Sequence, residues 1–204
     1  KEIRAEVLES GGKTPLLRVK ELGERFPDSI ALRNKEFGIW NEISYLDFWN
    51  RCTYLASALM DYGVNKGEKV AVHSENRPEW FISDLGIQAA GAVTVGLYPT
   101  NPKSEVEYLL GHSETVILFA EDQEQVDKAL AVRENLPSLK LIVYFDKKGM
   151  YKYDSEYLVS FEEFLEIGKE KLDLNIGQIT QTIDNIQDDD LALLVYTSGT
   201  TGPP

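Results

Sequence analysis

Between residues 69 and 144 the sequence alternates between short apolar segments and longer segments with helical periodicity. The apolar segments, which are typical of strands, are 69–73, 93–97, 115–119 and 141–144. The helical segments between them are 78–90, a helix announced by Ser104, and 122–134. Connections of this length join parallel strands through a helix, whereas a tight turn joins only antiparallel ones. We therefore predict an α/β fold in which a mostly parallel sheet is flanked by helices.

Local signals place the ends of several further elements. Ser104 and Glu107 have the spacing of a capping box, and residues 161–169 form a further predicted helix. The segment 146–157 and the acidic run 188–190 are interpreted as loops. Residues 191–196 are apolar throughout, which predicts a buried strand.

The amino-terminal part has a different pattern. Residues 29–33 and 37–43 have the composition of two short strands, and 34–36 would form the turn of a hairpin between them. Ser44 can cap a following helix whose apolar positions repeat every three or four residues as far as Met60, and Gly63 would end it. We therefore expect an amino-terminal segment, 1–68, with a hairpin and an amphipathic helix, followed by an α/β subdomain, 69–204.

Composition and charge exclude several classes of protein. The 204 residues are 43% hydrophobic, which is enough for a sizeable core. A formal net charge of -13 argues against nucleic acid as the main partner, because phosphate contacts require clustered Lys and Arg. A single cysteine, Cys52, cannot form an internal disulfide, so we expect a cytoplasmic protein. His73 and His112 lack the pattern of a zinc site and are interpreted as packing or capping residues. Peripheral membrane contact and a homodimer are left open.

The segment 196–202, Tyr-Thr-Ser-Gly-Thr-Thr-Gly, directly follows the apolar run and has the composition of a phosphate-binding loop. Its glycines allow the backbone to approach an anion closely, and its hydroxyls can donate to phosphate oxygens or bind a cation. In open α/β sheets, ligands bind at the carboxyl ends of strands, where this segment would lie. An ordinary Ser/Thr/Gly connection explains the composition equally well.

Two other motifs are rejected. Gly12-Lys13-Thr14 resembles the end of a Walker loop, but the glycine required five positions earlier is Val7. Ser198 is not the nucleophile of a G-x-S-x-G elbow, because the residue two positions before it is Tyr196.

The string at 196–202 resembles the nucleotide loop of the AMP-forming adenylate synthetases, the superfamily of acyl-CoA synthetases, luciferases and peptide-synthetase adenylation domains. Segments 67–72, 76–80 and 89–100 are similar to the first α/β subdomain of the same superfamily. Segment 106–113, followed by Glu121-Asp122, resembles the branch that acts on long-chain fatty acids. The family motif usually continues with a lysine and a glycine, before which this chain ends.

The resemblance implies an enzyme that joins a fatty acid to AMP, releases pyrophosphate, and transfers the acyl group to coenzyme A. ATP and Mg²⁺ are the implied cofactors, with CoA as co-substrate. The residues implied to hold the ATP phosphates are Thr197, Ser198, Gly199, Thr200, Thr201 and Gly202, with Thr200 nearest the magnesium. In the family the adenine, acyl and CoA sites lie beyond this loop. We therefore expect these 204 residues to be an amino-terminal portion that is inactive alone.

Two alternatives stay open at this point. One is an adenylating ligase for a short or aromatic acid. The other is a non-catalytic interaction module that retains the fold and the loop.

Overall fold

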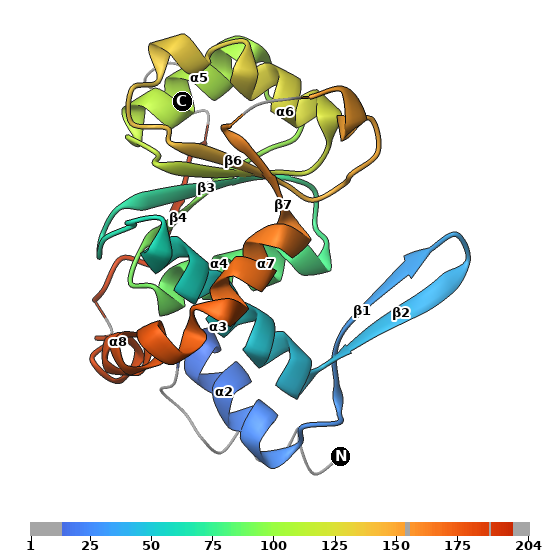
Figure 1. Cartoon of the computed structure of the whole chain (residues 1–204), viewed down its shortest axis with the longest axis vertical. Helices are drawn as coiled ribbons and strands as arrows, with labels where there is room; N and C mark the ends of the chain where they lie inside the picture. Colours follow the sequence, from blue (N-terminus) through green and yellow to red (C-terminus); the bar gives the residue numbers. More distant parts are fainter. Residues whose placement is uncertain (1–13, 154–155, 188, 198–204) are drawn as a thin grey trace. The chain divides into compact units, whose positions relative to one another are not determined.

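The structure is a computed structural model that describes residues 14–153, 156–187 and 189–197 (Figure 1). It divides into two compact units, one ending at Asn50 and the other beginning at Arg51. The division falls inside helix α3 (Tyr45–Asp61). A domain boundary between residues 68 and 69 stays a prediction.

The first unit begins with a helix that the sequence pattern did not predict. Helix α2 (Pro15–Arg25) starts where the Thr14 side chain accepts a hydrogen bond from the Leu17 amide, and Pro15 occupies the first helical turn. Proline fits there because that position needs no amide donor. Thr14 is thus a helix cap, whereas Gly12 and Lys13 lie outside the described residues.

A β-hairpin follows, with its turn at a different place from the one expected. Strands β1 (Ile30–Glu36) and β2 (Ile39–Ser44) pair antiparallel, and Glu36 lies opposite Ile39. The turn is therefore Phe37-Gly38, and the prediction of 34–36 was wrong. Both turn residues have positive φ angles, 47° and 84°, as a two-residue hairpin turn of type I′ requires. Gly38 adopts this conformation readily at the second position of the turn. This glycine was therefore the sequence signal for the position of the turn.

Helix α3 confirms the predicted amphipathic helix and its cap. The Ser44 hydroxyl accepts a hydrogen bond from the Asp47 amide at 3.2 Å. Gly63, with φ of 74°, follows the end of the helix.

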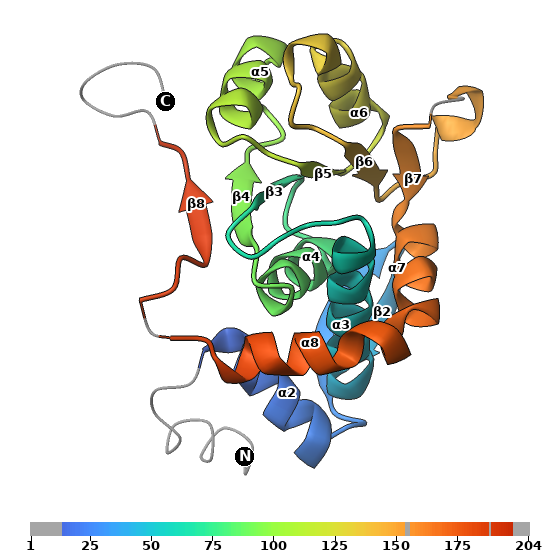
Figure 2. The ribbon, with the colours of Figure 1, turned by 60° about the vertical axis from the view of Figure 1, so that its left-hand side comes forward.

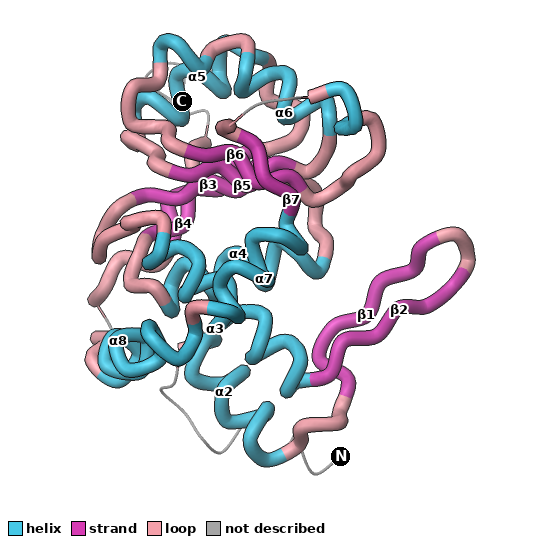
Figure 3. Tube along the Cα trace, in the orientation of Figure 1, coloured by secondary structure: helices cyan, strands magenta, loops and turns pink. Residues whose placement is uncertain are grey.

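The second unit contains the predicted parallel sheet (Figure 3). All five pairings between neighbouring strands are parallel. Across the sheet the strands are β7 (Leu158–Ser160), β6 (Leu141–Tyr144), β5 (Ile117–Ala120), β3 (Lys69–His73), β4 (Val93–Leu97) and β8 (Leu193–Val195). The α/β prediction is confirmed. Strand β7 was missed, because its three residues fall too close to a polar segment to show a pattern.

Helices cover both faces of this sheet (Figure 2). On one face lie α5 (Lys103–His112) and α6 (Gln123–Leu130), whose apolar residues share a core cluster with Ala71, Val95 and Leu118. On the other face lie α4 (Pro78–Ala89) and α7 (Phe161–Glu170), where Phe119 contacts Phe161 and Phe164. The remaining elements are helix α8 (Leu172–Asp184), which was not predicted, and the 3₁₀ turns η1 (Arg133–Asn135) and η2 (Met150–Lys152).

The capping box expected at Ser104 is absent. Helix α5 begins at Lys103 with Pro102 as its cap, so Ser104 already lies inside the helix. The Glu107 carboxylate instead accepts a hydrogen bond from Asn135 at 2.7 Å. A capping box does occur at the start of α7, between Ser160 and Glu163. The Ser-x-x-Glu spacing therefore marks a capping box at Ser160 and not at Ser104.

Strand β8 is not buried, contrary to the prediction for 191–196. Among the residues that the structure describes, it lies at the edge of the sheet and pairs only with β4, and Val195 is 57% exposed. A run of apolar residues predicts a strand but does not say whether that strand has one neighbour or two.

Across the described ranges, no helix combines the length and the apolar character needed to cross a membrane.

Candidate functional site

The carboxyl ends of the parallel strands gather at one edge of the sheet. The chain leaves β3 toward α4 on one face and leaves the neighbouring strand β4 toward α5 on the opposite face (Figure 2). Adjacent strands whose connections diverge in this way form the topological switch point where α/β proteins bind ligands. The candidate site is therefore the edge formed by the ends of β3, β4 and β8.

His73 is the last residue of β3, and its side chain contacts the chain just after β4. Its ring is fully buried, and Nε2 lies 3.1 Å from the carbonyl oxygen of Tyr98. Because a carbonyl only accepts, Nε2 carries the proton, and Nδ1 has no hydrogen-bond partner among the described residues. Burial, reinforced by the nearby Lys128 ammonium, lowers the pKa of His73 to about 4. His73 is a neutral packing residue, as the sequence interpretation expected.

We expect His73 to make the stability of the chain sensitive to acid. An unfolded His has a pKa of about 6.5, so between pH 6.5 and pH 4 the unfolded state binds more protons than the folded state. The stabilisation is complete above pH 6.5 and is lost as the pH falls toward 4, by about 2 to 3 kcal/mol. Urea denaturation at pH 7.5 and pH 4.5 measures this loss.

The matched variant is His73→Gln, whose amide nitrogen can still donate to the Tyr98 carbonyl but does not titrate. Its unfolding free energy should fall less over the same pH interval than that of the wild type. Equal losses in both proteins would show that His73 is not the group responsible.

The loop after β3 is joined to the loop after β5 by hydrogen bonds and charge. The Glu121 carboxylate accepts from the Glu75 amide at 2.7 Å and lies 3.8 Å from the Arg77 guanidinium. Asp122 caps α6 by accepting from the Glu124 amide at 2.9 Å. Glu121 and Asp122, which carried part of the family resemblance, thus have structural contacts here.

At the end of β8 the chain enters the predicted phosphate loop through Tyr196. This side chain is partly buried, and its hydroxyl lies 2.8 Å from Nδ1 of His112 in α5. Burial, and then the neighbouring Tyr108, raises the pKa of Tyr196, so the phenol is neutral and retains its proton.

The sequence interpretation of His112 as a packing or capping residue did not predict its contact with Tyr196. His112 is exposed, and Ser113, not His112, bonds back to the helix, with its hydroxyl 2.7 Å from the Leu109 carbonyl oxygen. The usable signal was the four-residue spacing between Tyr108 and His112, which places both rings on one face of a helix.

The predicted phosphate-binding residues are only partly described. Thr197 is exposed and directly follows Tyr196. Ser198, Gly199, Thr200, Thr201 and Gly202 lie outside the described residues. Within the described ranges, no three His, Cys, Asp or Glu side chains are grouped so that they could hold a metal ion. The assignment of this loop to phosphate and magnesium therefore stays a proposal.

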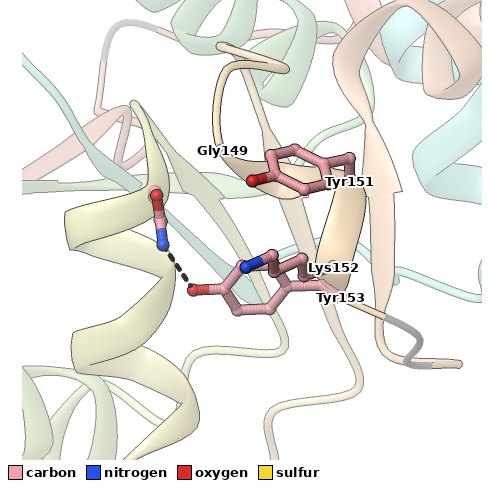
Figure 4. A pocket seen from close by; sticks show the side chains of 5 residues that line it. Gly149, Tyr151, Lys152 and Tyr153 are labelled. Atoms are coloured by element: carbon pink, nitrogen blue, oxygen red, sulfur yellow. Dashed lines mark hydrogen bonds between the residues drawn. The ribbon is translucent and has the colours of Figure 1, made fainter.

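A separate pocket of about 270 Å³ lies beside the start of α6 (Figure 4). It is lined by Gln123, Gly149, Tyr151, Lys152 and Tyr153. The Gln123 amide donates to the Tyr153 hydroxyl at 3.1 Å, and that hydroxyl also bonds to Asp127. These bonds hold η2 against α6, and we assign no function to the pocket.

Comparison with known proteins supports the family resemblance. The AMP-binding enzyme family matches residues 19–204. Over 185 residues the chain is 32% identical to the long-chain-fatty-acid–CoA ligase ACSBG2 of Xenopus laevis, a match that covers 91% of this chain and 24% of that protein. It is also 32% identical over 181 residues to the human long-chain-fatty-acid–CoA ligase ACSBG1, covering 89% of this chain and 24% of that protein.

A solved structure shares the fold. The anthranilate CoA ligase AuaEII, in complex with anthranoyl-AMP, matches with a TM-score of 0.71 and 25% identity, over 91% of this chain and 33% of the ligase. The chain thus spans about a quarter of the length of its curated relatives and a third of this structure. With its parallel α/β sheet and a match that reaches from residue 19 through the phosphate-binding segment at 196–202, which we call the glycine loop, the chain belongs to the AMP-binding enzyme family.

Proposed function

We propose that the full-length protein, meaning this chain together with the regions that match the rest of its relatives, activates a long-chain fatty acid with ATP. A carboxylate oxygen attacks the α-phosphorus, the bond from that phosphorus to the bridging oxygen breaks, and pyrophosphate leaves. The CoA sulfur then attacks the acyl carbon and AMP leaves. The observation that carries this proposal is the family match, which includes the glycine loop, together with relatives named as long-chain-fatty-acid–CoA ligases.

The electrostatic difficulty of the first step explains the composition of the loop. Two anions must approach each other, and negative charge then accumulates on the departing pyrophosphate. Fixed hydrogen-bond donors around the β- and γ-phosphates lower this barrier. We assign this role to Thr197, Ser198, Gly199, Thr201 and Gly202.

We assign Thr200 to the same phosphates and to the magnesium ion. A hydroxyl oxygen suits Mg²⁺, which prefers oxygen ligands. When bound, the ion would neutralise charge on the leaving group.

A second candidate substrate class is favoured by one specific observation. The solved ligase that shares the fold is named for anthranilate, an aromatic acid. The same adenylation chemistry would serve either acid, because the loop contacts only the nucleotide phosphates.

Acyl-CoA formation by the full-length protein, measured with ATP, CoA and a panel of acids, separates the two candidates. We expect palmitate and longer acids to be used with a kcat/KM at least about tenfold above that for acetate, benzoate or anthranilate, since each buried methylene contributes about 0.8 kcal/mol. A preference for benzoate or anthranilate would contradict the long-chain proposal and favour an aromatic acid ligase.

A further inference from the structure

In the described part of the chain, strand β8, which leads into the glycine loop, is hydrogen-bonded to the rest of the sheet along one side only. Strand β8 pairs with β4 through Leu193, Leu194 and Val195, and no further strand of the described residues lies on its other side. A strand of three residues that pairs with only one neighbour leaves the chain beyond its last paired residue weakly held. A loop that must place donors around a nucleotide therefore needs another support.

The first side chain beyond the ladder supplies a contact to a distant helix. Tyr196 packs against the core cluster of the α5 and α6 face, and its hydroxyl lies 2.8 Å from His112 Nδ1. The two rings meet edge to face, with centroids 5.7 Å apart. This contact joins residues 84 positions apart in the chain.

His112 is in turn held by its own helix. Its ring stacks on Tyr108, one turn earlier in α5, with centroids 5.5 Å apart and an interplanar angle of 27°. Helix α5 is fixed to the sheet by Val106, Leu109 and Leu110, all nearly inaccessible to solvent. Tyr108, His112 and Tyr196 therefore connect the start of the loop to a helix that is packed on the sheet through one face, and we call these three residues the loop anchor.

We propose that His112 is a positioning residue for the nucleotide loop and acts through the hydroxyl of Tyr196. This inference rests on the proposed function, because it assumes that the loop binds the phosphates of ATP. A displacement of about 1 Å in groups that position a substrate can strongly reduce the rate. The anchor should therefore affect the binding and alignment of ATP without touching it.

The test uses Tyr196→Phe and His112→Leu in the full-length protein. Each removes the hydrogen bond and keeps a bulky side chain, so we expect the KM for ATP to rise about three- to tenfold, with a smaller change in kcat. The double variant should be no worse than either single variant, because both remove the same interaction. His112→Asn, whose amide can occupy the place of Nδ1, should restore most of the affinity.

Tyr153→Phe is the matched control, since it also deletes a hydrogen-bonded tyrosine hydroxyl, the one shared with Gln123 and Asp127. It should leave the KM for ATP unchanged. A KM for Tyr196→Phe equal to that of the control, or additive effects in the double variant, would overturn the anchor.

A second readout does not depend on activity. Hydrogen exchange of the backbone amides of 195–197 should be faster in Tyr196→Phe and His112→Leu than in the wild type, and unchanged in Tyr153→Phe. Unchanged exchange in the first two variants would reject the anchor even in a protein that uses ATP. Faster exchange in these two variants, together with a wild type that forms no acyl-AMP, would support the contact while the proposed function fails.

Discussion

Replacing Thr200 by alanine in the full-length protein should lower the rate of acid-dependent ATP–pyrophosphate exchange by about a hundredfold or more. We propose that this hydroxyl lies nearest the magnesium and contributes to charge stabilisation on the departing pyrophosphate. Removing one donor of this kind typically costs 10²- to 10³-fold in kcat, because no water can replace a donor that was fixed in advance. The loss should appear in kcat more than in the KM for the acid, because we assign the loop to the nucleotide phosphates alone.

The control for this variant is Thr180→Ala. Thr180 is exposed on α8, so its replacement should change stability by less than about 0.5 kcal/mol and leave exchange intact. Thermal unfolding of both variants verifies that the proteins are folded. Full activity in Thr200→Ala would remove this residue from the proposed site.

Replacing Gly168 by alanine should destabilise the second unit by about 1 to 3 kcal/mol, the usual cost of overpacking. Gly168 lies in α7, where a Cβ atom would collide with the carbonyl oxygen of Tyr54 and lie 2.9 Å from the Ala58 backbone nitrogen. Both obstacles are backbone atoms of α3, so they cannot move aside as a flexible side chain would. This clash should outweigh the gain of about 1 kcal/mol that alanine normally brings inside a helix.

Gly177→Ala is the same substitution, but we expect it to change the stability in the opposite direction. Gly177 also lies inside a helix, α8, but a Cβ there meets nothing within 4 Å. This variant should therefore stabilise the chain by about 0.5 to 1 kcal/mol. Urea denaturation of the two variants beside the wild type measures both effects, and a stabilised Gly168→Ala would show that α7 and α3 are less closely packed than described.

The sequence predicted those parts of the fold that depend on local patterns. Strands β3, β4 and β6 were placed at the residues where the structure has them, because each is a short, mostly apolar run that follows a turn. The cap of α3 was equally local, since Ser44 and Asp47 are three residues apart.

The errors concern features that depend on distant residues. The burial of 191–196 was wrong because no local pattern says whether a strand lies at the edge of a sheet. The contact between His112 and Tyr196 was missed because the two residues are remote in the chain. Phosphate binding by the glycine loop was inferred from the composition of the loop and from its family resemblance. The periodicity of the sequence predicted only that the loop follows a strand.

We propose that this chain carries the nucleotide loop of an adenylate-forming ligase. Exchange of labelled pyrophosphate into ATP by the full-length protein, with Mg²⁺ but without CoA, tests it most directly because the assay isolates the first half-reaction. We expect exchange that depends on a long-chain fatty acid and falls about a hundredfold or more in Thr200→Ala. The absence of exchange with every carboxylic acid tried, in a full-length protein shown to be folded, would contradict the claim.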